Sequence, residues 1–593
     1  MTAQKEQWAS RAGLVLAMAG NAVGLGNFLR FPAQAAQNGG GAFLIPYLVA
    51  FVLMGIPLLW VEWAMGRYGG QFGHHSAPGI LDRMGKSRFL KYIGVFGLFT
   101  NLTLAAYYCY IESWTLAYVW HSLKGTFKAT PPTEFFPAYL GQHAGSITSL
   151  PPEATFFFVV TLALNGWILS RGLAKGIELA AKIGVPLLIV FGIILAVRGL
   201  SLGPGDAGVV ESPFKGLNFV WNPDLSGLGD FNVWLAAAGQ IFFTLSVGMG
   251  SIHCYASYVR KNRDVALNAA SAGWMNEFVE VILGGTLLIP IATAYLGLAA
   301  VQSATSGGSG FALGFLTLPT LFNNWGWFAP VAGAMWFGLL FFAGITSSLA
   351  MGQPILSFFA DEFGTARSKG ALLFAGCTFV LGMWCVWLYP GGSFDEFDFW
   401  TGTFSLVVFA LLEVIVFAWI FGMKKGWEEI TRGADMKVPV IYRYIIPYVT
   451  PLFLAVVFFG ALVQPEGGEW KAAVSGLFDG QGWPLSPGSV LGKLTHVGDA
   501  GGLARSERRG DVEDGEGPEP DPPHPRLRGL LGPRLRGVPQ EGKEGLVTGA
   551  AWAMLGVTWS VILFFTVRFF WKVLANPMPP ETDDGPDIPF KDA

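Results

Sequence analysis

The chain has 593 residues, of which 52% are hydrophobic and only 13% are charged. This composition, with 22 Trp and 49 Phe, is that of a membrane protein with many spans rather than a water-soluble one. The net charge of -3 and the absence of a basic stripe give no sign of a nucleic-acid partner. We therefore expect the protein to lie in a lipid bilayer.

Apolar stretches long enough to cross a bilayer, which takes about 20 residues each, recur along the chain. The sequence predicts twelve such helices, beginning near residues 11, 41, 88, 155, 177, 231, 264, 327, 368, 395, 440 and 549. The first follows Lys5 and Arg11 directly and carries no small-residue cleavage pattern, so we expect no cleavable signal.

Lysine and arginine residues collect in alternate loops, such as the loops around Lys86, Lys175, Lys261, Lys369 and Lys425. Loops rich in these residues stay on the cytoplasmic side. The pattern predicts a multi-pass protein of the cell's inner (plasma) membrane with both termini in the cytoplasm.

Two apolar stretches are interrupted by residues that do not suit a membrane helix. The first stretch contains Asn21-Ala22-Val23-Gly24-Leu25-Gly26-Asn27, and the sixth contains Thr244-Leu245-Ser246-Val247-Gly248-Met249-Gly250. Glycines weaken a helix, and amides at membrane depth need partners other than water. Interruptions at matching positions of two halves are typical of the binding site of a secondary transporter.

The region from about residue 496 to 545 departs from the rest of the chain. It is rich in Gly, Pro, Arg, Asp and Glu and has almost no aromatic residues. Such a composition predicts disorder, either in a true insertion or in a frameshifted stretch of the gene. Cys109, Cys254, Cys377 and Cys385 all fall in predicted helices, and their spacing suggests no zinc site.

Several ordered motifs between about residues 5 and 465 resemble the neurotransmitter:sodium symporter family, and its bacterial amino-acid transporters most closely. They include Trp8-Ala9-Ser10-Arg11, Asn38-Gly39-Gly40-Gly41-Ala42-Phe43, Gly239-Gln240-Ile241-Phe242-Phe243-Thr244 and Asp395-Glu396-Phe397-Asp398-Phe399-Trp400. The resemblance implies an all-α membrane protein with the LeuT fold: a 5+5 inverted repeat in which helices 1 and 6 are broken, plus two more helices. The expected division is residues 1–200 for the first repeat, 201–425 for the second and 426–593 for helices 11 and 12.

The broken first helix offers backbone carbonyl oxygens and the Asn27 side chain, which are uncharged ligands that suit sodium. The resemblance implies two sodium sites. One would use Ala22, Asn27, Thr244 and Asn276, and the other Gly20, Val23, Ala343, Thr346 and Ser347. From the residues alone, Thr346 and Ser347 could equally bond to the backbone of their own helix, and Asn27 and Asn276 could join helices.

The half-helix ends at the breaks present N–H groups and partial positive charge, for which an amino acid's carboxylate is a natural partner. The resemblance implies a substrate site of Asn21, Ala22, Leu25, Gly26, Leu104, Tyr108, Phe243, Thr244, Ser246, Met249, Ser347 and Met351. Tyr108 would donate to the carboxylate, although taken alone it could be a packed core aromatic.

Gly24 bears on the class of substrate. Relatives that transport monoamines carry Asp at this position, so glycine implies a substrate that brings its own carboxylate. The expected pocket has no charged side chain, and a charged substrate side chain would be buried unpaired. We therefore expect sodium-coupled import of a neutral, hydrophobic L-amino acid by alternating access. Another small zwitterion or an amine is the alternative, and Met249 and Met351, which differ from leucine-transporting relatives, leave the amino acid open.

Further residues are assigned roles by the resemblance. Arg30 and Asp398 would form an outer gate above Phe243, although they could also be a static ion pair. The inner gate would use Lys5, Tyr258 and Asp361, with Lys5 replacing the arginine of relatives. Glu280 stands where chloride-dependent relatives have a small hydroxyl residue, so no chloride requirement is expected.

Two other carboxyl groups are predicted at membrane depth. The resemblance implies that Glu62 braces the second break. Glu62 and Glu112 could equally be protonated carboxyl groups with a structural role. No enzyme motif such as a nucleophile elbow or phosphate loop is present, so we expect no enzyme. Polar residues cluster at two breaks rather than along a pore, which favours a transporter over a channel. The sequence does not decide whether the protein forms a homodimer.

Overall fold

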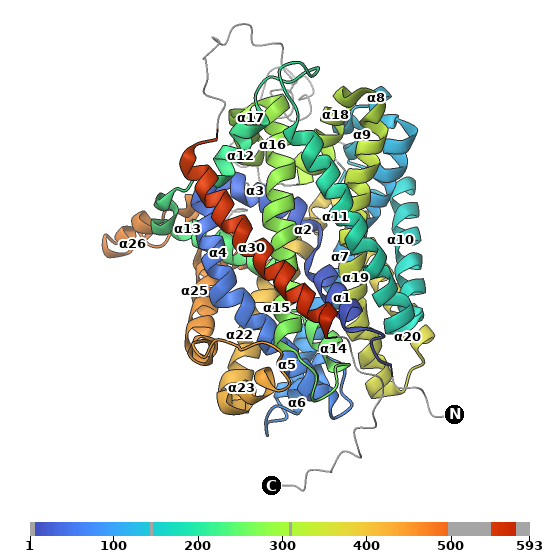
Figure 1. The fold of residues 1–593 in the computed structure, drawn as a ribbon, viewed down its shortest axis with the longest axis vertical. Coiled ribbons are helices and arrows are strands. Elements are labelled where there is room, and N and C mark those ends of the chain that lie inside the picture. The colour runs from blue at the N-terminus through green and yellow to red at the C-terminus, as the bar shows by residue number, and fades with distance from the viewer. Residues whose placement is uncertain (1–5, 143–145, 307–310, 496–546, 577–593) are drawn as a thin grey trace, which may run out of the picture.

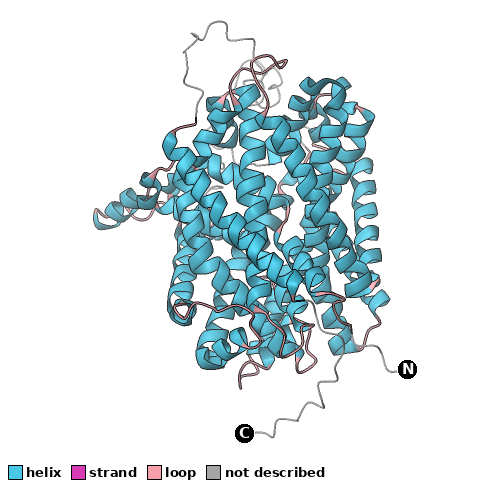
Figure 2. Cartoon of the chain, in the orientation of Figure 1, coloured by secondary structure: helices cyan, strands magenta, loops and turns pink. Residues whose placement is uncertain are grey.

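The computed structural model describes residues 6–142, 146–306, 311–495 and 547–576. These residues form helices and loops and contain no β-strand (Figure 2). The region predicted to be disordered or frameshifted, 496–545, and the gate candidate Lys5 lie outside the described residues.

The helices of the first part of the chain are α1 (Arg11–Ala22), α2 (Leu25–Phe28), α3 (Arg30–Gln37), α4 (Gly41–Ala50), α5 (Ile56–Gly70), α6 (Ala77–Asp82), α7 (Leu90–Lys124), α8 (Thr126–Ala129), α9 (Pro132–Tyr139), α10 (Pro152–Ser170), α11 (Glu178–Leu200) and α12 (Pro213–Trp221). Those of the second part are α13 (Phe231–Leu245), α14 (Ser251–Ser257), α15 (Ala266–Glu277), α16 (Gly285–Leu296), α17 (Leu298–Ser306), α18 (Leu318–Phe322), α19 (Ala329–Phe363), α20 (Arg367–Trp387), α21 (Ser393–Phe397), α22 (Leu406–Ile415), α23 (Met423–Thr431), α24 (Tyr442–Tyr444), α25 (Thr450–Val463), α26 (Trp470–Phe478), α27 (Val490–Leu494) and α30 (Gly549–Ala575).

Ten helical stretches of the described residues are long and apolar enough to cross a membrane. Short π-helical segments join several of the helices above into one stretch, as Phe51–Gly55 joins α4 to α5. Each stretch corresponds to one of the predicted spans. The span predicted to begin near 327 lies inside the longer stretch Ala312–Phe363, where α19 itself begins at Ala329.

The two predicted spans absent from these ten are those with the breaks. The helix that begins at Arg11 stops at Ala22, and the one that begins at Phe231 stops at Leu245. Helical structure resumes in α2 and α14. Positive φ angles at Ser246 (53°), Gly248 (76°) and Gly250 (79°) turn the backbone out of the helix in the second case.

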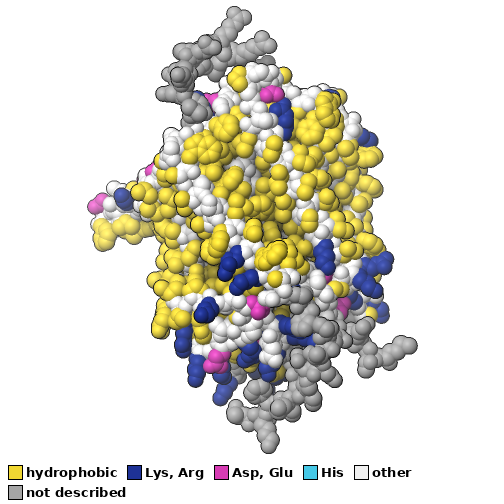
Figure 3. All heavy atoms as spheres, in the orientation of Figure 1, with side chains coloured by type: hydrophobic (Ala, Val, Ile, Leu, Met, Phe, Trp, Pro, Cys, Tyr) yellow, Lys and Arg dark blue, Asp and Glu magenta, His cyan; other side chains and the backbone are white. Residues whose placement is uncertain are grey.

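The long helices lie side by side, and α7 and α19 pack along each other in the interior (Figure 1). The first helix α1 contacts α11, α15 and α19, so the breaks lie inside the bundle. Large apolar side chains such as Phe156, Val197, Leu372 and Trp571 are exposed, as expected where helices face lipid. Apolar side chains cover most of the face in Figure 3, and lysine and arginine gather at its lower end.

The start of α1 and the end of α30 meet on the same side of the bundle. The Arg11 guanidinium donates to the carbonyl oxygen of Asn576 at 3.3 Å. It also forms ion pairs with Asp264 (2.8 Å) and Asp435 (2.5 Å). One buried arginine thus ties α1 to the beginning of α15 and to the loop after α23.

Candidate functional site

The two breaks face each other across a small cavity in the centre of the bundle. Its lining residues are Ala22, Gly24, Gly26, Asn27, Leu104, Tyr108, Phe243, Thr244, Ser246, Met249, Ser347, Met351 and Leu406. The cavity has a volume of about 10 Å³, which is room for about one water molecule. An amino acid can therefore enter only if the surrounding side chains or helices move.

The structure brings ten of the twelve residues predicted for substrate binding to this cavity. Asn21 and Leu25, the other two, do not line it, although the N–H of Leu25 donates to the hydroxyl oxygen of Tyr108, which does. The Asn21 side chain donates to Ser251 Oγ at 3.1 Å. Leu406, at the start of α22, lines the cavity and was not predicted.

The first break is held open by its own side chains and by Tyr108. The N–H of Gly24 donates to Asn27 Oδ1 (2.8 Å), and the N–H of Leu25 donates to the Tyr108 hydroxyl oxygen (3.1 Å). A Cβ at Gly24 would lie 2.8 Å from that hydroxyl and 3.1 Å from Ser347 Oγ. The N–H groups of the half-helix and the Tyr108 hydroxyl thus converge where a carboxylate would find hydrogen-bond donors.

The second break is joined to the first and to α5. Ser246 Oγ donates to the carbonyl oxygen of Asn21 at 2.8 Å. Glu62 Oε1 accepts the N–H of Gly248 at 2.7 Å, in agreement with the expectation that Glu62 braces this break. A buried backbone N–H that leaves the helix ladder needs such a partner.

Three of the four residues predicted for the first sodium site, Asn27, Thr244 and Asn276, form one buried cluster with Glu280. The Asn27 amide donates to Asn276 Oδ1 (2.8 Å), Thr244 Oγ1 (3.1 Å) and Glu280 Oε2 (3.0 Å). The Thr244 hydroxyl also bonds to Glu280, and Gln240 donates to its other oxygen at 2.7 Å. The carboxyl group of Glu280 is thus surrounded by amide and hydroxyl groups.

The second predicted sodium set joins α1 to α19. Ser347 Oγ donates to the carbonyl oxygens of Gly20 (3.3 Å) and Ala343 (3.1 Å). The Thr346 hydroxyl bonds to the Phe342 and Ala343 carbonyls of its own helix, and a Cβ at Gly20 would lie 2.9 Å from Thr346 Cβ. Both hydroxyl groups therefore donate to backbone carbonyl oxygens of their own helix, which was the alternative to sodium binding. Both also lie against α1. Val23, the remaining member of the set, donates its N–H to the carbonyl oxygen of Ala19 at 2.6 Å.

The outer gate candidates lie near each other without forming an ion pair within the described part of the chain. The Arg30 guanidinium stacks on the Phe243 ring, 4.6 Å from its centroid. Asp398 instead accepts a hydrogen bond from the Tyr107 hydroxyl at 2.8 Å. Phe243 also presses on Gly26, where a Cβ would lie 2.5 Å from its ring. The Arg30 side chain thus covers the aromatic ring that lines the cavity.

On the opposite side of the cavity, Tyr258 and Asp361 contact His75, in the loop after α5, rather than each other. Asp361 accepts the N–H of His75 at 2.7 Å, and the His75 ring stacks on Tyr258 with centroids 4.3 Å apart. A nearby ion pair joins Arg367 to Glu6 at 2.5 Å. Lys5, the third predicted member, is not among the described residues.

The segment before α1 packs against α14 and α11. Trp8 is 5% exposed, and its indole N–H donates to the carbonyl oxygen of Tyr255 at 3.1 Å. Glu178 accepts hydrogen bonds from the N–H of Ala9 (2.8 Å) and the hydroxyl of Ser10 (2.7 Å). The chain leading into the first broken helix is thereby packed over α14.

Glu112 belongs to a structural network. It accepts a hydrogen bond from Asn165 Nδ2 at 3.1 Å, and Ser348 donates to Asn165 Oδ1 at 2.7 Å.

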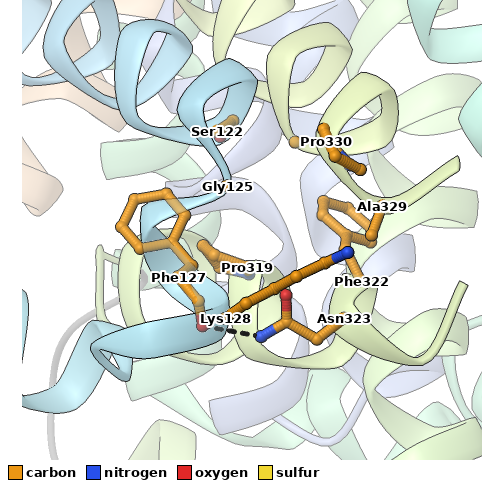
Figure 4. Close-up of a pocket in the computed structure, with 10 residues that line it drawn as sticks. Ser122, Gly125, Phe127, Lys128, Pro319, Phe322, Asn323, Ala329 and Pro330 are labelled. Carbon is orange, nitrogen blue, oxygen red and sulfur yellow. Dashed lines mark hydrogen bonds between the residues drawn. The ribbon is translucent and has the colours of Figure 1, made fainter. Parts of the chain in front are cut away.

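A second cavity of similar size lies between the end of α7 and the start of α19 (Figure 4). There Asn323 donates to the Phe127 carbonyl at 2.9 Å, and none of the residues predicted for binding lines it.

Some neighbours of the site were not predicted. Tyr47 donates to the buried carboxyl of Glu277, which is one turn before Glu280 on the same stretch. The i, i+3 spacing of two glutamates in an apolar stretch was a visible signal for this pair. Gln240 lies inside a motif that carries the family resemblance and Tyr107 directly precedes Tyr108, but nothing in the sequence indicated the partner of either.

An all-helical membrane protein whose two interrupted helices enclose a small central cavity has the form of a transporter for a small molecule. Comparison with known proteins agrees. The family model described as the sodium:neurotransmitter symporter family matches residues 5–128 and 124–478. The chain belongs to this family.

Relatives and solved structures cover the same part of the chain. An uncharacterized sodium-dependent transporter of Methanocaldococcus jannaschii is 32% identical over 77% of this chain and 90% of its own length. The sodium-dependent nutrient amino acid transporter 1 of Drosophila grimshawi is 24% identical over 78% of this chain and 77% of its own. The crystal structure of MhsT in complex with L-phenylalanine matches with a TM-score of 0.66 and 29% identity, over 77% of this chain and 99% of MhsT.

These comparisons confirm the predicted family and the prediction that the protein is no enzyme. The chain is a sodium-dependent, multi-pass membrane transporter whose fold resembles that of MhsT.

Proposed function

We propose that the protein imports a neutral, apolar L-amino acid together with sodium by alternating access. The observation that carries this proposal is the chemistry of the central cavity: its lining contains amide, hydroxyl, sulfur and apolar groups but no charged side chain. A buried charged substrate group would lack a partner there. The carboxylate and ammonium of an amino acid can instead use the open backbone of the two breaks.

Two sodium ions would be transported substrates. One would bind among Ala22, Asn27, Thr244 and Asn276, beside the substrate carboxylate. The other would bind between α1 and α19, where Gly20, Val23, Ala343, Thr346 and Ser347 supply oxygen atoms. The close approach of Gly20 to Thr346 and the hydrogen bonds of Ser347 to α1 support this second set.

We further propose the twelve-span topology, with α1 and α13 as the first halves of spans 1 and 6 and both termini in the cytoplasm. The hydrogen bond between Arg11 and Asn576 supports termini on one side. In this topology residues 1–200 and 201–425 form the inverted repeats, and 426–593 hold the last two spans.

The test of this proposal is uptake into vesicles that contain the purified protein. An inward sodium gradient should drive accumulation of labelled leucine or phenylalanine above the external concentration, and potassium in place of sodium should abolish it. Arginine and glutamate should not compete for uptake. Accumulation that is unchanged in potassium would contradict sodium coupling, and equal competition by charged amino acids would contradict the substrate class.

Glu280 should make uptake independent of chloride, because its carboxyl already lies among Asn27, Thr244 and Gln240. Glu280→Ser removes that negative charge, so uptake should then fall about tenfold or more when gluconate replaces chloride, a free-energy difference of about 1.4 kcal/mol. The matched control is Glu112→Gln, which alters a buried carboxyl away from this cluster. Wild-type uptake that falls equally in gluconate would contradict the role of Glu280.

A further inference from the structure

Three side chains that could bind a metal ion meet in the interior of the bundle, beyond the second break. Glu62 comes from α5, His253 from α14 and Glu413 from α22, and all three are fully buried. One ligand atom from each lies within 4.8 Å of the other two. None of the three lines the central cavity or belongs to the sodium sets.

The polar atoms of this cluster are unusually poor in partners. Both ring nitrogens of His253, both oxygens of Glu413 and Oε2 of Glu62 are buried without a hydrogen-bond partner. The one close approach is between His253 Nδ1 and Glu413 Oε1, at 3.3 Å. No lysine or arginine within the described ranges pairs with either carboxyl group. Buried polar groups without partners are costly, so something else must satisfy them.

A single metal ion satisfies more of these atoms than a proton does. One proton can bridge one pair of atoms, whereas a divalent ion takes a ligand from each side chain at once, and two carboxylates balance its charge. Imidazole and carboxylate ligands suit zinc and neighbouring transition metals, with bonds of about 2.0–2.2 Å. Modest side-chain rotations would bring the three ligand atoms to that distance from a common point.

We propose that Glu62, His253 and Glu413 bind a divalent first-row transition-metal ion, with Zn²⁺ as the representative, and that the bound ion inhibits transport. The imidazole distinguishes this site from the sodium sets, which offer oxygen atoms alone. Glu62 would keep one oxygen on the N–H of Gly248 and give the other to the metal. In this arrangement each of the three side chains gives one ligand atom to the metal.

Inhibition follows from the elements that the ion would join. The ion would link α14, which begins directly after the second break, to α5 and α22. Leu406 in the cavity wall is on the same helix as Glu413. A crosslink at this point would oppose movement of α14 relative to the cavity wall, and the cavity must expand to admit a substrate.

The binding test uses the purified full-length protein with an affinity tag that lacks histidine, stripped with a chelator and dialysed against Zn²⁺. We expect about one ion per chain. Loss of an outer-shell partner typically costs 10- to 100-fold in metal affinity, so loss of a ligand in His253→Leu should cost at least about as much. His74→Leu is the matched control, because His74 lies in the loop after α5 and contacts Arg83.

A second variant, Glu413→Gln, keeps the size of the side chain and should also lose zinc. Melting curves with and without sodium show which variants are folded. Wild-type protein that binds no zinc would overturn the proposal, as would a folded His253→Leu protein that binds zinc like the control. Either result would leave protons as the shared occupants of the cluster.

The inhibition test measures sodium-driven amino-acid uptake in vesicles at increasing Zn²⁺. Uptake by the wild type and by His74→Leu should fall, and that by His253→Leu should resist at least about tenfold more Zn²⁺. Equal inhibition of all three would contradict an inhibitory role for this site. Dialysis needs no transport activity, so a failure of the proposed function and a failure of zinc binding give separate results.

Discussion

Glycine at position 24 sets how closely the backbone of the first break approaches its neighbours. A Cβ at this position would already touch the Tyr108 hydroxyl and Ser347 Oγ. Gly24→Asp adds a carboxylate in the same space, next to the proposed position of the substrate carboxylate. We expect a loss of about 3 kcal/mol or more in binding, a factor of about 100.

The measurement for Gly24→Asp is sodium-dependent binding of leucine, methionine and phenylalanine to the purified protein. Gly239→Ala is the matched control, because a Cβ at Gly239 meets nothing within 4 Å. The control should bind like the wild type. Tight binding of any of the three amino acids by Gly24→Asp would refute the proposed substrate position.

At the scale of elements, two separate contacts bound the outer side of the cavity, one between α3 and α13 and one between α7 and the segment that begins at Asp398. Arg30 covers Phe243, and Asp398 holds the Tyr107 hydroxyl. Arg30, Phe243 and Asp398 are partly exposed, whereas Tyr107 is buried. Because Asn at position 398 keeps an acceptor oxygen for the Tyr107 hydroxyl, the change should cost about 1 kcal/mol or less in stability. Asp398→Asn should therefore leave the melting temperature nearly unchanged and speed the escape of bound substrate to the outside.

The experiment compares substrate dissociation from sodium-loaded protein with a melting curve of the same variant. Tyr107→Phe removes the hydroxyl partner of Asp398 and should change dissociation in the same direction. An Asp398→Asn protein that melts at a much lower temperature but retains substrate like the wild type would show that Asp398 is structural.

The segment before α1 is expected to close the inner side. Trp8 packs on Tyr255, and Cys254, the residue before it, is buried with its sulfur 3.2 Å from Ser357 Oγ. Trp8→Ala removes a large buried side chain and should open this packing. In a background of Cys109→Ser, Cys377→Ser and Cys385→Ser, labelling of Cys254 by a water-soluble thiol reagent should become at least several-fold faster.

Trp327→Ala is the control for the loss of a tryptophan, because Trp327 is 86% exposed and far along the chain from this segment. It should label like the parent. If Trp8→Ala is folded, binds substrate and still labels at the parent rate, the segment does not control access to α14.

At the scale of the whole molecule, buried arginines join the ends of helices that are distant in sequence. Arg67 at the end of α5 is fully buried, pairs with Glu429 on α23 at 2.8 Å and donates to the carbonyl oxygens of Arg263, Arg432 and Glu429. Arg67→Met removes a buried guanidinium with its backbone contacts and leaves Glu429 with the partly exposed Arg432 as its ion-pair partner, at 2.7 Å, so it should cost about 3–5 kcal/mol.

A thermal melt in detergent measures this loss. Arg198→Met is the matched control, since Arg198 and its partner Asp206 are each 31% exposed, and it should cost about 1 kcal/mol or less. Adding Glu429→Gln to Arg67→Met should recover part of the loss. Equal melting temperatures for the two single variants would contradict the role of the buried pair.

The sequence predicted the family and the positions of the two helix breaks because both depend on short local motifs. Gly24, Gly248 and Gly250 are visible as anomalies inside apolar runs, whatever their partners are. Contacts made by packing were harder to predict. Leu406 is an ordinary apolar residue, and nothing in its neighbourhood indicates that it faces the cavity.

The same reason explains the polar groups whose partners differ from expectation. Arg30 has a long side chain that can reach either Asp398 or the Phe243 ring, and the sequence cannot decide between them. The meeting of Glu62, His253 and Glu413 depends on how α5, α14 and α22 pack over separations of more than a hundred residues. Local patterns contain no information on such a convergence.

The shortness of α1 and α13 has a consequence for topology assignment by hydropathy. A count restricted to uninterrupted helices gives ten spans, and the proposed topology has twelve. Because two spans are missed, parity is preserved and the two chain ends are still assigned to one side. Every loop between Ala22 and Phe231 nevertheless lies on opposite faces in the two counts, so reporter fusions in those loops discriminate between the counts where terminal tags cannot.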